Sequence, residues 1–225
     1  MGMGKSGPRR GAGKKIGLLG GTFDPIHIGH LRSAQEVLEA FNLNQVIFIP
    51  SAIPPHKPDY ATIAARHRLQ MVKLAVADNP SFTVSDVEIR REGRSYTVET
   101  ISHFLKNTQE AGQLFYIIGA DAFYEIETWK DYAQLFALCD FVVVSRPHFE
   151  PQRAPVLKSE RFRKEAGEDH CYRHPSGHLL YLLRVTPIGI SSTGIRNAIK
   201  EGRAITYLVP KEVEAYIEQR RLYRK

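Results

Sequence analysis

The stretch "KKIGLLGGTFDPIHIGHLRSAQEVLEAF", residues 14–41, decides the fold of this 225-residue chain. Its first part is a short, mostly apolar run that predicts a buried β-strand. Gly20 and Gly21 follow the strand and allow a tight turn with close approach of a ligand to the backbone. From residue 28 onward, apolar side chains recur at helical spacing. A strand that passes through a glycine turn into a helix is the start of a β-α-β unit.

The rest of the chain repeats this alternation of strands and helices. Apolar runs predict strands at residues 45–51, 82–91, 114–121, 139–147 and from 178 onward. Helical periodicity predicts helices at residues 61–78, at 97–109 with Thr97 as cap, and at 210–223 with Pro210 in a helix-opening position. We therefore expect an α/β fold: a Rossmann-like, doubly wound parallel sheet with helices on both faces and a C-terminal helical segment.

The two remaining segments differ in composition from the rest. Residues 1–14 form a Gly-rich basic lead without an acidic residue, and we expect this lead to be disordered. Residues 148–178 are polar, contain several Pro, Gly and His residues, and show no period, which predicts an irregular insertion. We expect residues 15–225 to form a single domain that includes this insertion.

Charge and cysteine content exclude several classes of protein. The net charge is +7, but Lys15 and the four cations of the lead supply five of these charges, so the basic balance does not predict a nucleic-acid partner. The sequence has neither an apolar run of membrane-spanning length nor the apolar stretch of a secretory signal. Cys139 and Cys171 are the only cysteines, which fits the reducing cytoplasm and provides no disulfide framework.

His27 and His30 follow the glycine turn and are the first candidates for chemistry. Their spacing places both imidazoles on one face of a helix start, where free amides and the helix dipole favour an anion. Such donors suit a polyphosphate and the charge that develops in phosphoryl transfer. A zinc site is the competing interpretation, but zinc needs three or four ligands, and no Glu or Cys lies at matching spacing. A simple glycine turn with two incidental histidines also remains open.

The stretch "GTFDPIHIGH" resembles the signature, ending in H-x-G-H, of the nucleotidyltransferase α/β-phosphodiesterase superfamily. A second motif of that superfamily is expected near the C-terminus, and "ISSTGIR" at residues 190–196 is similar to it. Ser191 or Ser192 can cap a helix whose amides face phosphates. Arg196 adds a planar cation suited to phosphate oxygens.

Between these motifs the chain resembles the bacterial nicotinate mononucleotide adenylyltransferase family. The resemblance rests on "IPSAIPPHK", "SYTVETI", "IIGADAFYEIETW" and "VVVSRP" and covers most of the chain. It implies transfer of the adenylyl group of ATP to nicotinate mononucleotide, which yields deamido-NAD and pyrophosphate in NAD biosynthesis. Magnesium is expected to enter through the phosphates of ATP, with no metal ligands from the protein.

The resemblance also implies roles for individual residues. The expected catalytic residues, placed on the ATP phosphates, are His27, His30 and Arg196. The expected ATP-binding residues are Gly20, Gly21, Thr22, Phe23, Ser191, Ser192 and Thr193. The expected nicotinate mononucleotide-binding residues are Lys57, Thr97, Asp121, Trp129 and Arg146.

Two alternatives stay open at this point. The first is another nucleotidyltransferase of the superfamily, with nicotinamide mononucleotide, phosphopantetheine or a cytidylyl acceptor. The second is a non-catalytic nucleotide-binding module, against which the presence of His27, His30 and Arg196 argues. Two residues depart from the family pattern, His148 after "SRP" and Gly189 before "ISST". The sequence leaves the oligomeric state open, a homo-oligomer included.

Overall fold

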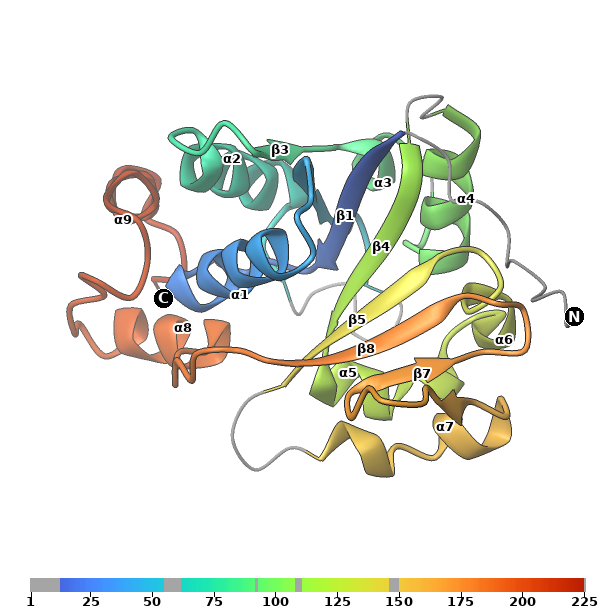
Figure 1. The fold of residues 1–225 in the computed structure, drawn as a ribbon. Helices are drawn as coiled ribbons and strands as arrows, with labels where there is room; N and C mark the ends of the chain where they lie inside the picture. The colour runs from blue at the N-terminus through green and yellow to red at the C-terminus, as the bar shows by residue number, and fades with distance from the viewer. Residues whose placement is uncertain (1–12, 55–61, 92, 108–110, 146–149, 225) are drawn as a thin grey trace, which may run out of the picture.

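The computed structural model describes residues 13–54, 62–91, 93–107, 111–145 and 150–224. Within them, one sheet has the strand order β3-β2-β1-β4-β5-β8-β7-β6 (Figure 1). The strands from β3 to β8 in that order pair in parallel, whereas β7 and β6 add antiparallel. The strand bounds are β1 (Lys14–Gly21), β2 (Gln45–Pro50), β3 (Phe82–Val84), β4 (Ala111–Gly119), β5 (Asp140–Ser145), β6 (Arg163–Lys164), β7 (Cys171–Arg173) and β8 (Leu179–Arg184).

Helices cover both faces of the sheet, which confirms the doubly wound α/β prediction (Figure 1). One face carries α1 (Ile28–Ala40), α2 (Ala65–Val76), α8 (Ser192–Lys200) and the C-terminal helix α9 (Lys211–Gln219). The other face carries α3 (Val87–Arg90), α4 (Thr97–Asn107), α5 (Ala120–Tyr124), η1 (Ile126–Thr128), α6 (Tyr132–Leu135), η2 (Pro151–Arg153) and α7 (Val156–Ser159). From β1, the chain adds β2 and β3 toward one edge of the sheet. It then returns to the other side of β1 and adds β4, β5 and β8 toward the opposite edge. The direction of strand addition therefore reverses between β1 and β4.

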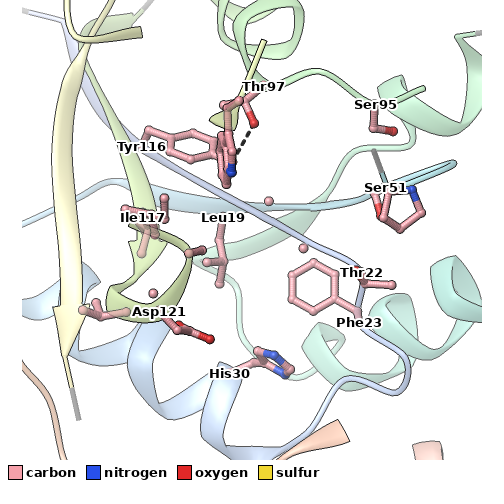
Figure 2. A pocket seen from close by; sticks show the side chains of 18 of the residues that line it. Leu19, Thr22, Phe23, His30, Ser51, Ser95, Thr97, Tyr116, Ile117 and Asp121 are labelled. Carbon is pink, nitrogen blue, oxygen red and sulfur yellow. Dashed lines mark hydrogen bonds between the residues drawn. The ribbon is translucent and has the colours of Figure 1, made fainter. Parts of the chain in front are cut away.

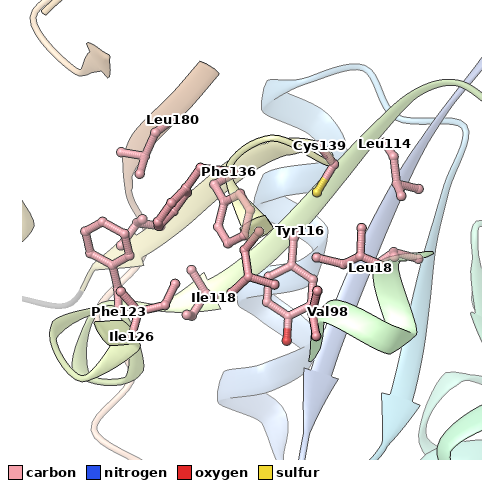
Figure 3. Close-up of a cluster of buried hydrophobic side chains, with 14 of the residues drawn as sticks. Leu18, Val98, Leu114, Tyr116, Ile118, Phe123, Ile126, Phe136, Cys139 and Leu180 are labelled. Carbon is pink, nitrogen blue, oxygen red and sulfur yellow. The ribbon is translucent and has the colours of Figure 1, made fainter. Parts of the chain in front are cut away.

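Each face of the sheet has its own apolar core. Along β1, Leu18 points into the core that contains α4, and Leu19 points into the core that contains α1. Figure 3 shows the first of these cores, where Leu18 and Tyr116 pack near Val98. Because side chains alternate along a strand, central strands that are covered on both sides need apolar residues at nearly every position. That requirement explains the unbroken apolar runs in the sequence.

The extended segment predicted at residues 82–91 is only partly a strand. β3 ends at Val84, and the chain then turns into the short helix α3. The Ser85 hydroxyl accepts from the amide of Val87 at 3.3 Å, and Asp86 pairs with Arg90 at 2.9 Å. These local bonds favour a helical turn over a strand. Thr97, predicted as a cap, is instead the first residue of α4.

Residues 150–178 are less irregular than the sequence predicted. Residues 171–173 form β7, which pairs antiparallel with β8, and β6 pairs in turn with β7. The side chain of Cys171 is buried, and the ring of Phe162 packs edge-on against Phe136 at 5.1 Å. The segment therefore extends the sheet and carries its own apolar contacts. β1 begins at Lys14, the last residue of the predicted lead, and residues 1–12 lie outside the described part of the chain.

Candidate active site

A cavity of about 530 Å³ lies at the carboxyl ends of the strands (Figure 2). Its lining comes from segments far apart in the sequence: the end of β1 with the turn after it, the start of α1, the segment after β2, the segment before α4, and the end of β4 with the segment after it. In a doubly wound sheet, ligands bind at this edge where the strand order reverses. The reversal between β1 and β4 therefore explains why the cavity forms there.

His30 is the histidine of the first motif that lines the cavity. Its Nδ1 accepts a hydrogen bond from the backbone amide of His27 at 3.3 Å. Because Nδ1 accepts, the neutral imidazole carries its proton on Nε2 and can donate from that atom. His27, the residue before α1, is 2% exposed, and its ring stacks on His30 with centroids 3.7 Å apart. The structure thus brings both predicted histidines together, with His27 behind His30.

The two glycines predicted to follow the first strand are instead the last two residues of β1, where they bring the backbone close to the cavity. A Cβ on Gly20 would lie 2.8 Å from the hydroxyl oxygen of Tyr116, and a Cβ on Gly21 would lie 2.9 Å from the ring of Phe23. Both positions therefore require glycine while these aromatic rings keep their places. Phe23 itself has φ 49°, in the left-handed region that a sharp turn requires. Gly20, Gly21, Thr22 and Phe23 all line the cavity.

The second motif packs directly on the first. Ser191 caps α8 by accepting from the amide of Gly194 at 3.1 Å, and the hydroxyl of Ser192 donates to the carbonyl of Pro25 at 2.9 Å. Arg196 donates to the carbonyl of Asp24 at 2.8 Å and to the hydroxyl of Thr193 at 3.1 Å. Ser191, Ser192, Thr193 and Arg196 are not among the lining residues of the cavity. Ser192 and Arg196 instead bind the backbone of the turn beside the cavity. The side chain of Arg196 is 24% exposed.

The residues predicted for the acceptor lie in the same cavity. Thr97, Asp121 and Trp129 are lining residues, and Figure 2 shows Thr97 beside Tyr116 with Asp121 and His30 at the other end of the view. The Thr97 and Tyr116 hydroxyl oxygens are 3.4 Å apart. Burial raises the pKa of Tyr116 well above its usual range, so its hydroxyl stays protonated. The predicted residues Lys57 and Arg146 lie outside the described residues.

Comparison with known proteins decides the family. Residues 18–198 match the cytidylyltransferase-like family. The chain is 45% identical over 213 residues to the probable nicotinate-nucleotide adenylyltransferase of Geotalea daltonii, an alignment that covers 93% of this chain and 98% of the relative. The chain belongs to the nicotinate-nucleotide adenylyltransferase family. The corresponding protein of Geobacter metallireducens is also 45% identical, with the same coverage.

Solved structures support the same fold for this family member. The chain resembles the nicotinic acid mononucleotide adenylyltransferase of Plasmodium falciparum complexed with NaAD, with a TM-score of 0.71 over 93% of this chain and 97% of that one. A putative nicotinate-nucleotide adenylyltransferase of Vibrio parahaemolyticus gives a TM-score of 0.59. The sequence identities are 17% and 19%, so these likenesses concern the fold alone.

Arg68 does not line the cavity but holds the backbone beside it, and this residue was not identified from the sequence. Its side chain is 0% exposed, and its guanidinium donates to the carbonyls of Thr22 and Ala52 at 2.8 Å each and to that of Ile63 at 3.2 Å. Burial lowers the pKa of this arginine. It ties the turn after β1 to the segment after β2. Its place on the apolar stripe of α2, in line with Met71, was the available signal.

Glu88 and Lys130 line the cavity without having been predicted. Glu88 is buried and accepts from the hydroxyl of Thr100 at 2.6 Å, and burial raises the pKa of its carboxyl. Lys130 pairs with Glu99 at 2.9 Å and lies over the ring of Tyr96, 4.4 Å from its centroid. These three contacts join residues that are distant in the sequence, so no local pattern predicted them.

The described residues contain no group of three or more His, Cys, Asp or Glu side chains arranged to hold a metal ion. In the same part of the chain, no helix is long and apolar enough to cross a membrane.

Proposed function

We infer that this site transfers the adenylyl group of ATP to the 5′-phosphate of nicotinate mononucleotide, giving deamido-NAD and pyrophosphate. One observation carries the inference beyond family membership. A single cavity is lined both by the phosphate motif, with His30, and by the acceptor residues Thr97, Asp121 and Trp129. Transfer of a group between two nucleotides requires both to bind next to each other. One cavity lined by both sets of residues can hold them in that way.

The phosphate motif supports the ATP side of the reaction. An oxygen of the acceptor phosphate attacks the α-phosphorus of ATP, and the bond from that phosphorus to the bridging oxygen of pyrophosphate breaks. The Nε2 proton of His30 hydrogen-bonds to phosphate oxygens as charge develops. Arg196 adds positive charge at the edge of the turn, while His27 supports the ring of His30. The backbone of residues 20–23 and the capped start of α8 supply further donors.

The opposite end of the cavity suits the pyridine nucleotide. Trp129 offers an aromatic face for stacking on the pyridine ring. Thr97 is the first residue of α4, where the helix dipole favours the nicotinate carboxylate. Asp121 accepts from a ribose hydroxyl, and a Cβ on Gly119 would lie 2.7 Å from its Oδ1, which leaves the carboxylate close to the backbone. Lys57 and Arg146 complete the proposal as contacts to the substrate phosphate.

Magnesium is proposed to enter the site bound to the phosphates of ATP. The described residues provide no group of three metal-binding side chains, and Mg²⁺ commonly binds through one or two carboxylates plus substrate phosphates. When bound, the ion supplies positive charge to the leaving pyrophosphate. The protein's own part is to position the two phosphates and to donate hydrogen bonds to them.

The remaining proposals concern the whole chain. We propose that residues 15–225 form one nucleotidyltransferase domain, because one sheet runs through the described part of them.

A cytoplasmic location agrees with Cys139 and Cys171 being buried free thiols. Light scattering on the full chain decides between a monomer and the homo-oligomer that the sequence leaves open.

An acceptor panel tests the proposed reaction. Pyrophosphate release is measured with ATP, magnesium and, separately, nicotinate mononucleotide, nicotinamide mononucleotide or pantetheine phosphate. We expect release to be fastest with nicotinate mononucleotide. Faster pyrophosphate release with nicotinamide mononucleotide would show that this nucleotide is the preferred acceptor. Release with pantetheine phosphate alone would overturn the proposal.

A further inference from the structure

The C-terminal end of the chain returns to the phosphate motif. In Figure 1 the C-terminus lies beside the start of α1 and close to α8. After α9, Leu222 is buried in the core beneath α1 and α2, and its amide donates to the carbonyl of Ile217 at 3.0 Å. The next residue, Tyr223, donates its hydroxyl to Oδ1 of Asp24 at 2.8 Å. This bond joins the third residue from the end of the chain to the turn that precedes His27.

Asp24 is placed where its charge affects Arg196. Its carboxylate is buried, with 2% of the residue exposed, and Oδ2 lies 3.8 Å from the guanidinium of Arg196. Arg196 meanwhile donates to the backbone carbonyl of the same aspartate. Burial, and then the charge of Asp24, raise the pKa of Tyr223, so its hydroxyl remains a donor at any physiological pH.

We propose that Tyr223 is a positioning residue for adenylyl transfer, which holds Asp24 away from a close pair with Arg196. The inference rests on the proposed function. A carboxylate and a guanidinium within reach prefer two parallel hydrogen bonds. The Tyr223 hydroxyl donates to Oδ1 of Asp24, so this oxygen does not bind the guanidinium. The other oxygen, Oδ2, lies 3.8 Å from Nη1 of Arg196. The positive charge of Arg196 then remains available to the phosphates of ATP.

Tyr223→Phe tests this role, because the variant removes the hydroxyl and leaves the ring. We expect kcat/KM for ATP and the affinity for a non-hydrolysable ATP analogue each to fall about tenfold, the effect of losing a hydrogen bond to a charged group. The KM for nicotinate mononucleotide should not change. A loss for ATP without a change in the KM for nicotinate mononucleotide would distinguish a positioning role at the phosphates from a general loss of structure.

Tyr216→Phe is the matched control. Tyr216 lies in α9, and its hydroxyl bonds to Nδ1 of His67 in α2 at 2.9 Å, so the same atom is removed from the same C-terminal region. Both variants should lower the unfolding midpoint, and only Tyr223→Phe should weaken the affinity for ATP and lower kcat/KM for ATP. Equal kinetics in the two variants would overturn the proposal.

A double-mutant cycle tests whether Tyr223 acts through Asp24. If it does, adding Tyr223→Phe to Asp24→Asn should reduce kcat/KM for ATP by much less than tenfold, because the two residues act as one unit. Independent, multiplying losses would contradict the mechanism. If the unmodified chain shows no turnover, the proposed function fails separately, and affinity for the ATP analogue still decides the role of Tyr223.

Discussion

The hydroxyl of Ser192 donates to the carbonyl of Pro25 over 2.9 Å, joining residues that are 167 positions apart. Arg196, one turn further along α8, donates to the carbonyl of Asp24 in the same turn. The second phosphate motif therefore fixes the backbone of the first. The two motifs form one structural unit at the edge of the sheet.

Ser192→Ala should weaken this unit. The variant leaves the carbonyl of Pro25 without its hydroxyl donor, so we expect the free energy of unfolding to fall by about 1 kcal/mol and the KM for ATP to rise about fivefold. Ser176→Ala is the control, since its hydroxyl also donates to a distant carbonyl, that of Phe136 at 2.8 Å. Ser176→Ala should lower the free energy of unfolding without changing the KM for ATP. An unchanged KM for ATP in Ser192→Ala would contradict the linkage.

His30→Ala should remove most of the turnover. Loss of one preorganised donor to developing charge lowers kcat by about 10²- to 10³-fold. Steady-state pyrophosphate release with saturating ATP and nicotinate mononucleotide measures the effect. His103 is an exposed histidine of α4, and His103→Ala should behave as the unmodified chain. Full activity of His30→Ala would remove His30 from its assigned role and favour a merely structural motif.

Trp129 gives a direct optical test of acceptor binding, because it is the sole tryptophan of the chain and lines the cavity. Stacking on the pyridine ring should quench its fluorescence when nicotinate mononucleotide is added, while AMP should have little effect. Trp129→Ala should raise the KM for nicotinate mononucleotide about tenfold, since a stacked aromatic pair contributes about 1 kcal/mol beyond area burial. An undisturbed fluorescence signal at saturating acceptor would show that the pyridine ring binds elsewhere.

Arg68→Met should strongly destabilise the chain. The substitution leaves three carbonyls without the guanidinium that binds them, and we expect a loss of about 3 kcal/mol in the free energy of unfolding. Urea titration measures it. Arg203→Met, at an arginine paired with Glu201 on the surface, should change stability by less than about 0.5 kcal/mol. Similar losses in both variants would refute the role assigned to the buried arginine.

Glu88→Gln should change the pH dependence of stability. Burial raises the pKa of Glu88 above its ordinary value of 4.5, so the folded chain binds this proton more tightly than the unfolded chain. Stability is therefore greatest below that value and falls as pH rises through the folded pKa. Relative to the unmodified chain, Glu88→Gln should gain stability as pH rises from about 4 to about 8. Urea titrations across that range that show a constant or shrinking difference would contradict this sign.

Local patterns predicted much of the fold and of the site. The apolar run of residues 14–20 is a strand because both faces of β1 are covered, and that requirement is visible in the sequence itself. Gly20 and Gly21 were predicted to follow the strand, but they are its last two residues and pair with Ile49 and Pro50 of β2. Thr97, Asp121 and Trp129 were expected at one site because of the family resemblance, and all three line the cavity at the carboxyl edge of the sheet.

Long-range contacts account for what the sequence did not reveal. Tyr223 meets Asp24 across 199 positions, and nothing near either residue predicts the pair. The strand β7 was missed because three residues next to a turn carry too short a pattern, and its pairing with β8 supplies the stability. α3 was predicted as extended because its apolar residues, Val87 and Ile89, alternate like those of a strand.

A crystal structure of the chain with deamido-NAD tests the central claim most directly. One cavity is proposed to hold both halves of this product. The account predicts the adenylyl phosphate within hydrogen-bond distance of His30 Nε2 and the pyridine ring stacked on Trp129. A product molecule with its pyridine ring outside this cavity, or with its phosphates away from the turn at residues 20–23, would contradict it.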